Sequence, residues 1–410
     1  MSSDTNIKPI ILNTTNGEQE GQFSLIHIPL PLYSSLLQPI LAVLLPHGGP
    51  TNPNDPEGLL DGLSLDNKHG FLNISVTPIE CSIVCHSSWA RNVFAPVIAR
   101  LPKEASKQCQ ISKDTYIVFS VNSAGMEAGQ RVMDLTAPLA MAGIPIFFIT
   151  TYYTDFILVP SKDRQTVGSA LLERGFEFSE NDSAYVAPTA ISHSRIPSTA
   201  SSDPPSTPPP SNVAELQGRT FTQLKKRNVV PFVEPGLHVV QCSGKEILSR
   251  DEYPNRNGSR NGNGNGANGN HGHQSSWMEN IDPKLCIALV SALVQQPRFL
   301  SVTLAQDDAP SLLVDKSLLW LFGNSIAGDT EGDLVPIFLD LVDLPLESTG
   351  IVCGVAGKLV DEMRMSDEAS HENELSYLST ARAGAVILSG EGSERALQAL
   401  LPLLEQGEKK

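Results

Sequence analysis

Apolar runs and short polar turns follow the same order in two stretches of the chain. Residues 144–159, IPIFFITTYYTDFILV, predict an apolar strand, a polar turn and a second apolar strand. Residues 375–388, LSYLSTARAGAVIL, repeat this order less strongly. The flanking segments with helical spacing are 129–141, 165–174, 354–363 and 393–404. A strand–helix–strand–strand–helix unit that occurs twice indicates internal duplication, and it places two equivalent turns at one interface, where a small ligand is more suitable than catalysis.

Weaker apolar patterns predict two further units of the same kind. In the first, the predicted strands are 22–28, 70–78 and 81–86, and the predicted helices lie within 33–45 and 89–100. In the third, the predicted strands are 237–241, 300–305 and 312–314, and the helices are 283–294 and 318–322. Strands at 114–121 and 334–342 open the second and fourth units. We therefore expect an α+β protein of four small modules.

Composition divides the chain between these modules and low-complexity segments. The Pro/Ser run 202–211 favours an extended linker, and the Asn/Gly tract 255–273 favours a disordered insertion. The expected organisation is a disordered N-terminus (1–20), module 1 (21–110), module 2 (111–178), a linker (179–219), module 3 (220–330, with the insertion at 250–276) and module 4 (331–405).

Charge and cysteine usage narrow the class of protein. The 410 residues carry a formal net charge of −16, and the dense basic cluster is Lys225-Lys226-Arg227, which is interpreted as solvated linker charge or a nuclear-localisation signal. Nucleic acid is not an expected partner. The 6 dispersed cysteines indicate reduced thiols and a cytoplasmic protein. The start lacks a basic signal region, and prolines interrupt the apolar run 26–46, so no secretion or membrane span is expected.

Motifs for catalysis or for cofactors are incomplete. The segment 352–359, VCGVAGKL, lacks the first glycine and the hydroxyl residue of a phosphate-binding loop. Cys81, Cys85 and His86 lack a second ligand pair for zinc, and His47 is interpreted as a loop residue. No nucleophile elbow or zinc-protease motif is present. We expect no enzyme activity, no cofactor and no metal.

Two features favour ligand or partner binding. The glycine-containing helix start 348–352 and its counterpart 122–125 present backbone N–H groups that suit a carboxylate, although an ordinary N-cap explains them as well. Tyr152, Tyr153 and Asp155 form an aromatic and acidic cluster in the first turn, which suits a partner surface or is a solvated hairpin turn.

The residues Thr151-Tyr152-x-Thr154-Asp155-Phe156-Ile157-Leu158-Val159 resemble the TYxTDFILV signature of the CASTOR family of cytosolic arginine sensors and their ACT-domain relatives. The similarity extends to 114–125, DTYIVFSVNSAG, and to 349–359. The resemblance implies four ACT-like modules (βαββαβ, ferredoxin-like) in two tandem pairs, covering residues 22–178 and 236–405.

The resemblance also implies a function. It implies a non-enzymatic, amino-acid-binding regulator of TOR-pathway nutrient signalling that acts through the GATOR complex and forms a homodimer through modules 1 and 3. The implied ligand-binding residues are Pro145, Ile146, Gly350, Ile351, Val352, Thr380, Ala381 and Gly384. The implied partner-binding residues are Tyr152, Tyr153 and Asp155.

Two departures argue against arginine as the ligand. Pro145 replaces the pocket serine of the arginine sensors, and Gly384 replaces their pocket aspartate. A guanidinium group needs a carboxylate partner, and Arg382 beside this position favours a neutral or anionic ligand. Two alternatives stay open: a ligand-free ACT-domain scaffold, and a regulatory subunit of an amino-acid biosynthetic enzyme.

Overall fold

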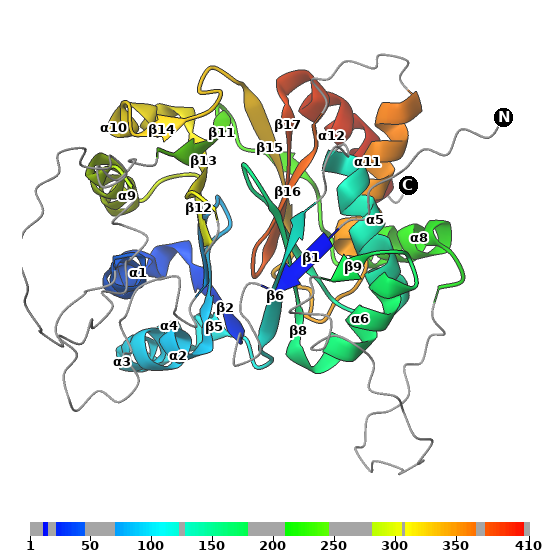
Figure 1. Cartoon of the computed structure of the whole chain (residues 1–410), viewed down its shortest axis with the longest axis horizontal. Coiled ribbons are helices and arrows are strands. Elements are labelled where there is room, and N and C mark those ends of the chain that lie inside the picture. The colour runs from blue at the N-terminus through cyan, green and yellow to red at the C-terminus, as the bar shows by residue number, and fades with distance from the viewer. Residues whose placement is uncertain are drawn as a thin grey trace, which may run out of the picture.

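A computed structural model describes residues 11–14, 22–45, 70–122, 128–178, 210–245, 281–305, 308–365 and 374–405. These residues form four layers, with two β-sheets in the middle and helices on both outer faces (Figure 1). The helices over the first sheet are α1 (Leu37–Leu44), α2 (Ser87–Trp89), α3 (Ala95–Arg100), α4 (Lys103–Gln108), α9 (Pro283–Val294) and α10 (Leu319–Phe322). The helices over the second sheet are α5 (Ala128–Met141), α6 (Arg164–Leu172), α8 (Val213–Lys226), α11 (Ile351–Met365) and α12 (Gly390–Leu404). The mixed content of helices and strands agrees with the predicted α+β class.

The first sheet combines strands from the two halves of the chain. Its strand order is β5-β2-β4-β3-β12-β13-β11-β14. The strands are β2 (Phe23–Pro29), β3 (Phe71–Val76), β4 (Glu80–His86), β5 (Gln110–Ile111), β11 (Val239–Gly244), β12 (Leu300–Ala305), β13 (Ser311–Asp315) and β14 (Ile326–Ala327). The halves meet where antiparallel β3 and β12 pair around Ile74 and Val302.

The second sheet is built in the same way. Its strand order is β9-β1-β6-β8-β7-β16-β17-β15-β10. The strands are β1 (Ile11–Thr14), β6 (Tyr116–Asn122), β7 (Phe147–Thr150), β8 (Asp155–Pro160), β9 (Glu177–Phe178), β10 (Phe232–Val233), β15 (Leu334–Asp340), β16 (Ser376–Ser379) and β17 (Ala383–Ser389). The halves meet at Ile149 and Leu378. Bridges from Phe23 to Tyr116 and from Val239 to Leu334 join the two sheets, so that the strand pairings close into a barrel.

The apolar strands predicted from the sequence are buried on both faces. In β8, Phe156 and Leu158 belong to the core between the sheets, whereas Ile157 and Val159 pack under the helices of the second sheet. A strand that is covered on both sides needs apolar residues at consecutive positions. The continuous run FILV is therefore a consequence of the layered fold.

Two segments differ from the expected organisation. Ile11–Thr14 forms β1 between β6 and β9, although residues 1–20 are predicted to be disordered. Four residues are too short for a periodic signal, and this strand exists because an open edge of β6 accepts it. Helix α8 begins at Val213, inside the predicted linker 179–219. The Pro/Ser run at 202–209 and the Asn/Gly tract lie outside the described residues.

Helix α8 has a local start signal and a packed face. The Asn212 side chain accepts a hydrogen bond from the Glu215 backbone N–H at 2.8 Å, which caps the helix. Leu216, Thr220 and Leu224 are buried at a four-residue spacing, and they place α8 against α11, α5 and α12. The Lys225-Lys226-Arg227 cluster lies at the C-terminal end of this helix rather than in a linker.

Candidate functional site

The two predicted turns are related by an approximate twofold axis at the junction of β7 and β16. The Phe148 N–H donates to Ser379 Oγ at 2.9 Å, and the Tyr377 N–H donates to Thr150 Oγ1 at 3.0 Å. Phe148 and Tyr377 occupy equivalent positions, as do Thr150 and Ser379, because β8 and β17 pair with β6 and β15 in matching register. The internal duplication inferred from the sequence is therefore visible as paired side-chain contacts.

The turns themselves are closed by the same hydrogen bonds. The Thr151 N–H donates to the Thr154 carbonyl at 3.2 Å, and the Thr380 N–H donates to the Ala383 carbonyl at 2.9 Å. In each turn the threonine Oγ1 also accepts from the N–H of the fourth residue, Thr154 or Ala383. The hydroxyl of a threonine at the first position of a four-residue turn hydrogen-bonds to backbone groups of that turn. This explains why threonine occurs at the start of both turns.

Each turn then binds one half of the first sheet. The Tyr152 N–H donates to Ser311 Oγ at 2.7 Å, and the Ala381 N–H donates to Ser82 Oγ at 3.0 Å. Ser82 and Ser311 are equivalent residues of β4 and β13. The β7–β8 turn is thereby fixed to the second half of the chain, and the β16–β17 turn is fixed to the first half.

A pocket lies beside the axis, between the N-terminus of α11 and the start of β7. It contains seven of the eight predicted ligand-binding residues: Ile146, Gly350, Ile351, Val352, Thr380, Ala381 and Gly384. Pro145 precedes Ile146 in the chain and does not line the pocket. The structure thus brings these residues together, and their contact with a ligand stays a prediction. The counterpart start at 123–125 lies outside the described residues.

The pocket is small and carries no charged side chain. Its volume is about 40 Å³, enough for a few water molecules and too little for an amino acid. Leu341, Leu344 and Leu346, from the segment between β15 and α11, supply an apolar wall. A ligand of amino-acid size therefore needs a displacement of the wall.

Tyr377 supplies a polar group to this apolar pocket. Its side chain is 1% exposed, and burial raises the pKa of the phenol above its ordinary value. Among the described residues no hydrogen-bond partner contacts the hydroxyl. A Cβ atom on Gly384 would lie 2.8 Å from this oxygen. Tyr377 therefore occupies the space that an acidic side chain at position 384 would need.

Helix α8 packs against the N-terminal end of α11 beside the pocket. Gly350 has a φ of +80°, and a Cβ atom there would lie 2.9 Å from both Leu216 Cδ1 and Thr220 Oγ1. Thr220 Oγ1 donates to the Gly350 carbonyl at 3.3 Å, and Gln223 Nε2 donates to Ser348 Oγ at 3.3 Å. Glycine at position 350 is required by the backbone conformation and by this close approach.

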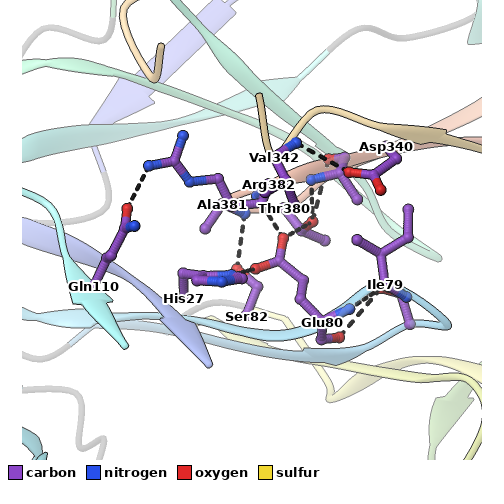
Figure 2. A network of polar contacts seen from close by, with 12 residues as sticks. His27, Ile79, Glu80, Ser82, Gln110, Asp340, Val342, Thr380, Ala381 and Arg382 are labelled. Atoms are coloured by element: carbon purple, nitrogen blue, oxygen red, sulfur yellow. Dashed lines mark hydrogen bonds and ion pairs between the residues drawn. The ribbon is translucent and has the colours of Figure 1, made fainter. Parts of the chain in front are cut away.

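A buried carboxylate ties the other side of the pocket to the first sheet (Figure 2). Glu80 is 0% exposed, and its Oε1 accepts from Thr380 Oγ1 at 2.6 Å and from the Arg382 N–H at 2.5 Å. Its Oε2 lies 2.5 Å from His27 Nδ1. Thr380 also lines the pocket. A displacement of this pocket wall would therefore disturb a fully buried charge.

Arg382 does not face the pocket, in contrast to the sequence-based expectation. Its Nη1 donates to the Leu344 carbonyl at 2.8 Å, and its Nη2 donates to Gln110 Oε1 (Figure 2). The guanidinium is therefore occupied by structural contacts, and it adds no positive charge to the pocket. The argument for an anionic ligand loses its basis.

The predicted partner-binding residues separate into two groups. Tyr152 and Tyr153 are 38% and 56% exposed, and a partner role for them stays a prediction. Asp155 is 3% exposed, and its Oδ2 accepts from Arg131 Nε at 2.8 Å. Burial raises the pKa of Asp155, while the Arg131 guanidinium acts in the opposite direction. The expectation of an exposed acid at this position is wrong.

Sequence reasoning missed several residues of the site. Tyr377 and Ser379 belong to a strand predicted only as an echo of the first, and residues 341–346 carry no motif. Glu80 could have been found from the sequence. A charged residue that lies at the edge of an apolar strand and has no oppositely charged neighbour in the sequence often pairs with a residue far away in the chain. His27, on a neighbouring strand, supplied no comparable signal.

Within the described ranges no helix is long and apolar enough to cross a membrane. In the same ranges no group of three or more His, Cys, Asp or Glu side chains is placed to hold a metal ion.

Comparison with known proteins identifies one part of the chain. Residues 111–173 match the ACT domain family. No curated protein is significantly similar to the chain. Among solved structures, the protein Atu0741 of Agobacterium tumefaciens shares 19% identity at a TM-score of 0.25, covering 42% of this chain and 92% of that one. Aspartate kinase from Synechocystis shares 10% identity at a TM-score of 0.29, and all of this chain spans 58% of that enzyme.

The matched range runs from the end of β5 to the end of α6 and contains the first of the two turns. ACT domains are generally regulatory modules that bind amino acids. Residues 111–173 of this chain are an ACT domain.

Proposed function

We propose that the protein is a non-enzymatic regulator that binds an amino acid in the pocket between β7 and the N-terminus of α11. The observation that carries this proposal is the clustering of seven predicted ligand residues around one cavity beside an ACT domain. Backbone N–H groups at the start of a 15-residue helix suit the ligand carboxylate.

The proposal extends the ACT assignment to the other three units. Each unit has the order strand, helix, two strands, helix, and in units 1 and 3 a short fourth strand follows. Across the sheet, the strands of units 1 and 3 lie in the order fourth, first, third, second. In unit 2, β1 lies between the first and fourth strands, and in unit 4, β10 takes the place of the fourth strand. The arrangement supports two tandem pairs that are interleaved in space.

The lining favours an amino acid with an uncharged side chain. Apolar residues and the Tyr377 hydroxyl would contact the side chain, and no carboxylate is available for a basic group. Because the cavity has a volume of only about 40 Å³, binding would select a state with a larger pocket, and that difference between states is what a partner could recognise. A cytoplasmic role in TOR-pathway signalling through a GATOR-like partner, with homodimer formation, rests on the CASTOR resemblance.

The ligand-free scaffold is the second candidate. The small volume and the apolar wall favour it, because a filled pocket needs no ligand for stability. The alternative of a regulatory subunit for a biosynthetic enzyme would be recognised by copurification with that enzyme.

A thermal-shift screen of the full-length protein against the twenty amino acids tests the proposal. A ligand at about a hundred times its dissociation constant stabilises the folded state by roughly 2.7 kcal/mol, so an uncharged amino acid should raise Tm by a few degrees. Ile146→Trp, which fills the half-buried pocket wall, should abolish the shift. Ile287→Trp on exposed α9 is the matched control and should retain it. A flat screen with a cooperatively melting protein would favour the scaffold.

A further inference from the structure

A second cavity lies on the opposite side of the twofold axis and has a volume of about 410 Å³. It lies between the β7–β8 turn, the start of β16, strand β11 and the loop that precedes β15. The residues that matter for its chemistry are Arg131, Tyr152, Tyr153, Gln241, Asp329 and Glu374. Its volume falls in the range of small-molecule sites, which is about 300–1,000 Å³.

The internal duplication makes this cavity the counterpart of the first pocket. Thr150, Thr151 and Tyr152 line it, and the equivalent residues Ser379, Thr380 and Ala381 line the first pocket. The chain has therefore kept two versions of one interface. The versions differ in chemistry, because charged and aromatic residues line the second cavity and uncharged, mainly apolar residues line the first.

The charges of the second cavity favour a cation. The Arg131 guanidinium is matched by Asp155, at 2.8 Å. Glu374 and Asp329 add two carboxylates to the lining. Asp329 Oδ1 accepts from the N–H groups of Glu331 and Gly332, each at 3.0 Å, which holds its carboxylate in place. The net charge available to a ligand is negative.

Two tyrosine rings form an aromatic wall. The Tyr152 and Tyr153 rings meet edge to face with centroids 4.8 Å apart. Tyr153 Oη is hydrogen-bonded to Ser243 Oγ at 3.0 Å. The Tyr152 ring packs against Gly328, which has a φ of +115°, and a Cβ atom at this position would clash with the ring. Both rings are thus held in the lining of the cavity, and aromatic faces attract ammonium and guanidinium groups.

We propose that the cavity lined by Tyr152, Tyr153, Asp329 and Glu374 binds a small organic cation through an ammonium or guanidinium group. Asp329 and Glu374 accept its N–H groups, and the tyrosine rings cover its alkyl chain. A basic amino acid and a polyamine share this chemistry. The Arg131 guanidinium lies in the same cavity and is held by Asp155 at 2.8 Å. The site is separate from the pocket beside α11 and does not depend on the function proposed for that pocket.

Isothermal titration of the full-length protein with L-lysine, L-arginine, putrescine, L-leucine and L-glutamate tests the site. We expect binding of at least one of the three cations and a loss of affinity of about tenfold or more in Glu374→Gln combined with Asp329→Asn. Glu173→Gln combined with Asp163→Asn, on exposed and half-exposed positions around α6, is the matched control and should keep the affinity. Selective binding of the amino acids identifies them as the source, whereas equal binding of putrescine identifies the cationic group alone.

Two outcomes would overturn the proposal: no heat from any cation at 10 mM ligand, roughly the weakest affinity worth calling a site, or cation binding that the double variant leaves unchanged. Ile146→Trp separates this site from the other pocket, because it should abolish binding of an uncharged amino acid and leave cation binding intact. Circular dichroism of each variant checks that the fold is retained.

Discussion

At the scale of single residues, Glu80 is the side chain with the largest expected effect on stability. It is fully buried, yet three donors from two distant parts of the chain meet its carboxylate. An isolated buried charge is strongly unfavourable, and hydrogen bonds to both oxygens are what make this one tolerable. Removal of the carboxylate should therefore lower the free energy of unfolding because those donors lose a hydrogen bond.

Replacement of Glu80 should separate the role of charge from the role of hydrogen bonding. Glu80→Ala leaves the Arg382 N–H and His27 without their partner and removes the shorter of the two hydrogen bonds of the Thr380 hydroxyl, so it should lower the free energy of unfolding by about 3 kcal/mol or more. Glu80→Gln keeps one acceptor oxygen and should cost less. The measurement is the urea midpoint of the full-length protein.

Glu104→Ala is the control for that comparison. Its side chain is 83% exposed and pairs with Lys107, so that its loss should cost less than about 1 kcal/mol. Equal midpoints for Glu80→Ala and Glu104→Ala would mean that the network in Figure 2 contributes little to the folded state.

At the scale of elements, helix α8 shows where local pattern and tertiary structure differ. The sequence supports its cap and its apolar spacing, but the preceding Pro/Ser run makes the whole region resemble a linker. The strands of the hairpins were predictable because both of their faces are buried. By contrast, β1, β10 and β14 have two to four residues each, and they are strands only because longer neighbours offer an edge.

The residues of the candidate site also fall into two groups, those that a local sequence pattern predicts and those that it does not. Turn residues and glycines could be predicted because local hydrogen bonds and a positive φ restrict the residue type, as at Thr380 and Gly350. Tyr377 and Glu80 contact Thr150 and Thr380, which lie 227 and 300 residues away from them along the chain. No local pattern specifies such a contact.

Two glycine-to-alanine substitutions test the packing of α8 on α11. A methyl group at Gly354 would lie 2.8 Å from Thr220 Cγ2, whereas one at Gly218 meets nothing within 4 Å. Both glycines lie inside helices, where alanine is favoured by about 0.5–1 kcal/mol. Gly218→Ala should therefore raise the stability, and Gly354→Ala should lower it by about 1 kcal/mol.

Thermal melting gives the sign of each change, and amide hydrogen exchange in residues 213–226 locates it. We expect faster exchange of α8 in Gly354→Ala alone. If both variants gain stability to the same extent, α8 does not pack closely on α11.

At the scale of the whole molecule, the two halves of the chain are interleaved rather than placed side by side. Strand β3 pairs with β12 through six residue pairs from Phe71–Ala305 to Val76–Leu300, and β7 meets β16 at the centre of the second sheet. The turns at 151–154 and 380–383 add contacts from each half to the other. In each half taken alone, the strand edges at these junctions would have no pairing partner.

Expression of the halves therefore gives the most direct test of the architecture. Residues 1–178 alone would expose the edges of β3 and β7, and residues 210–410 alone would expose β12 and β16. Exposed edges pair with other chains. Each half alone should aggregate or form homo-oligomers through these edges, whereas co-expression should yield a soluble one-to-one complex on size-exclusion chromatography. Cooperative melting of residues 1–178 as a monomer would contradict this expectation, because it would show that modules 1 and 2 bury enough surface without the strands from the second half.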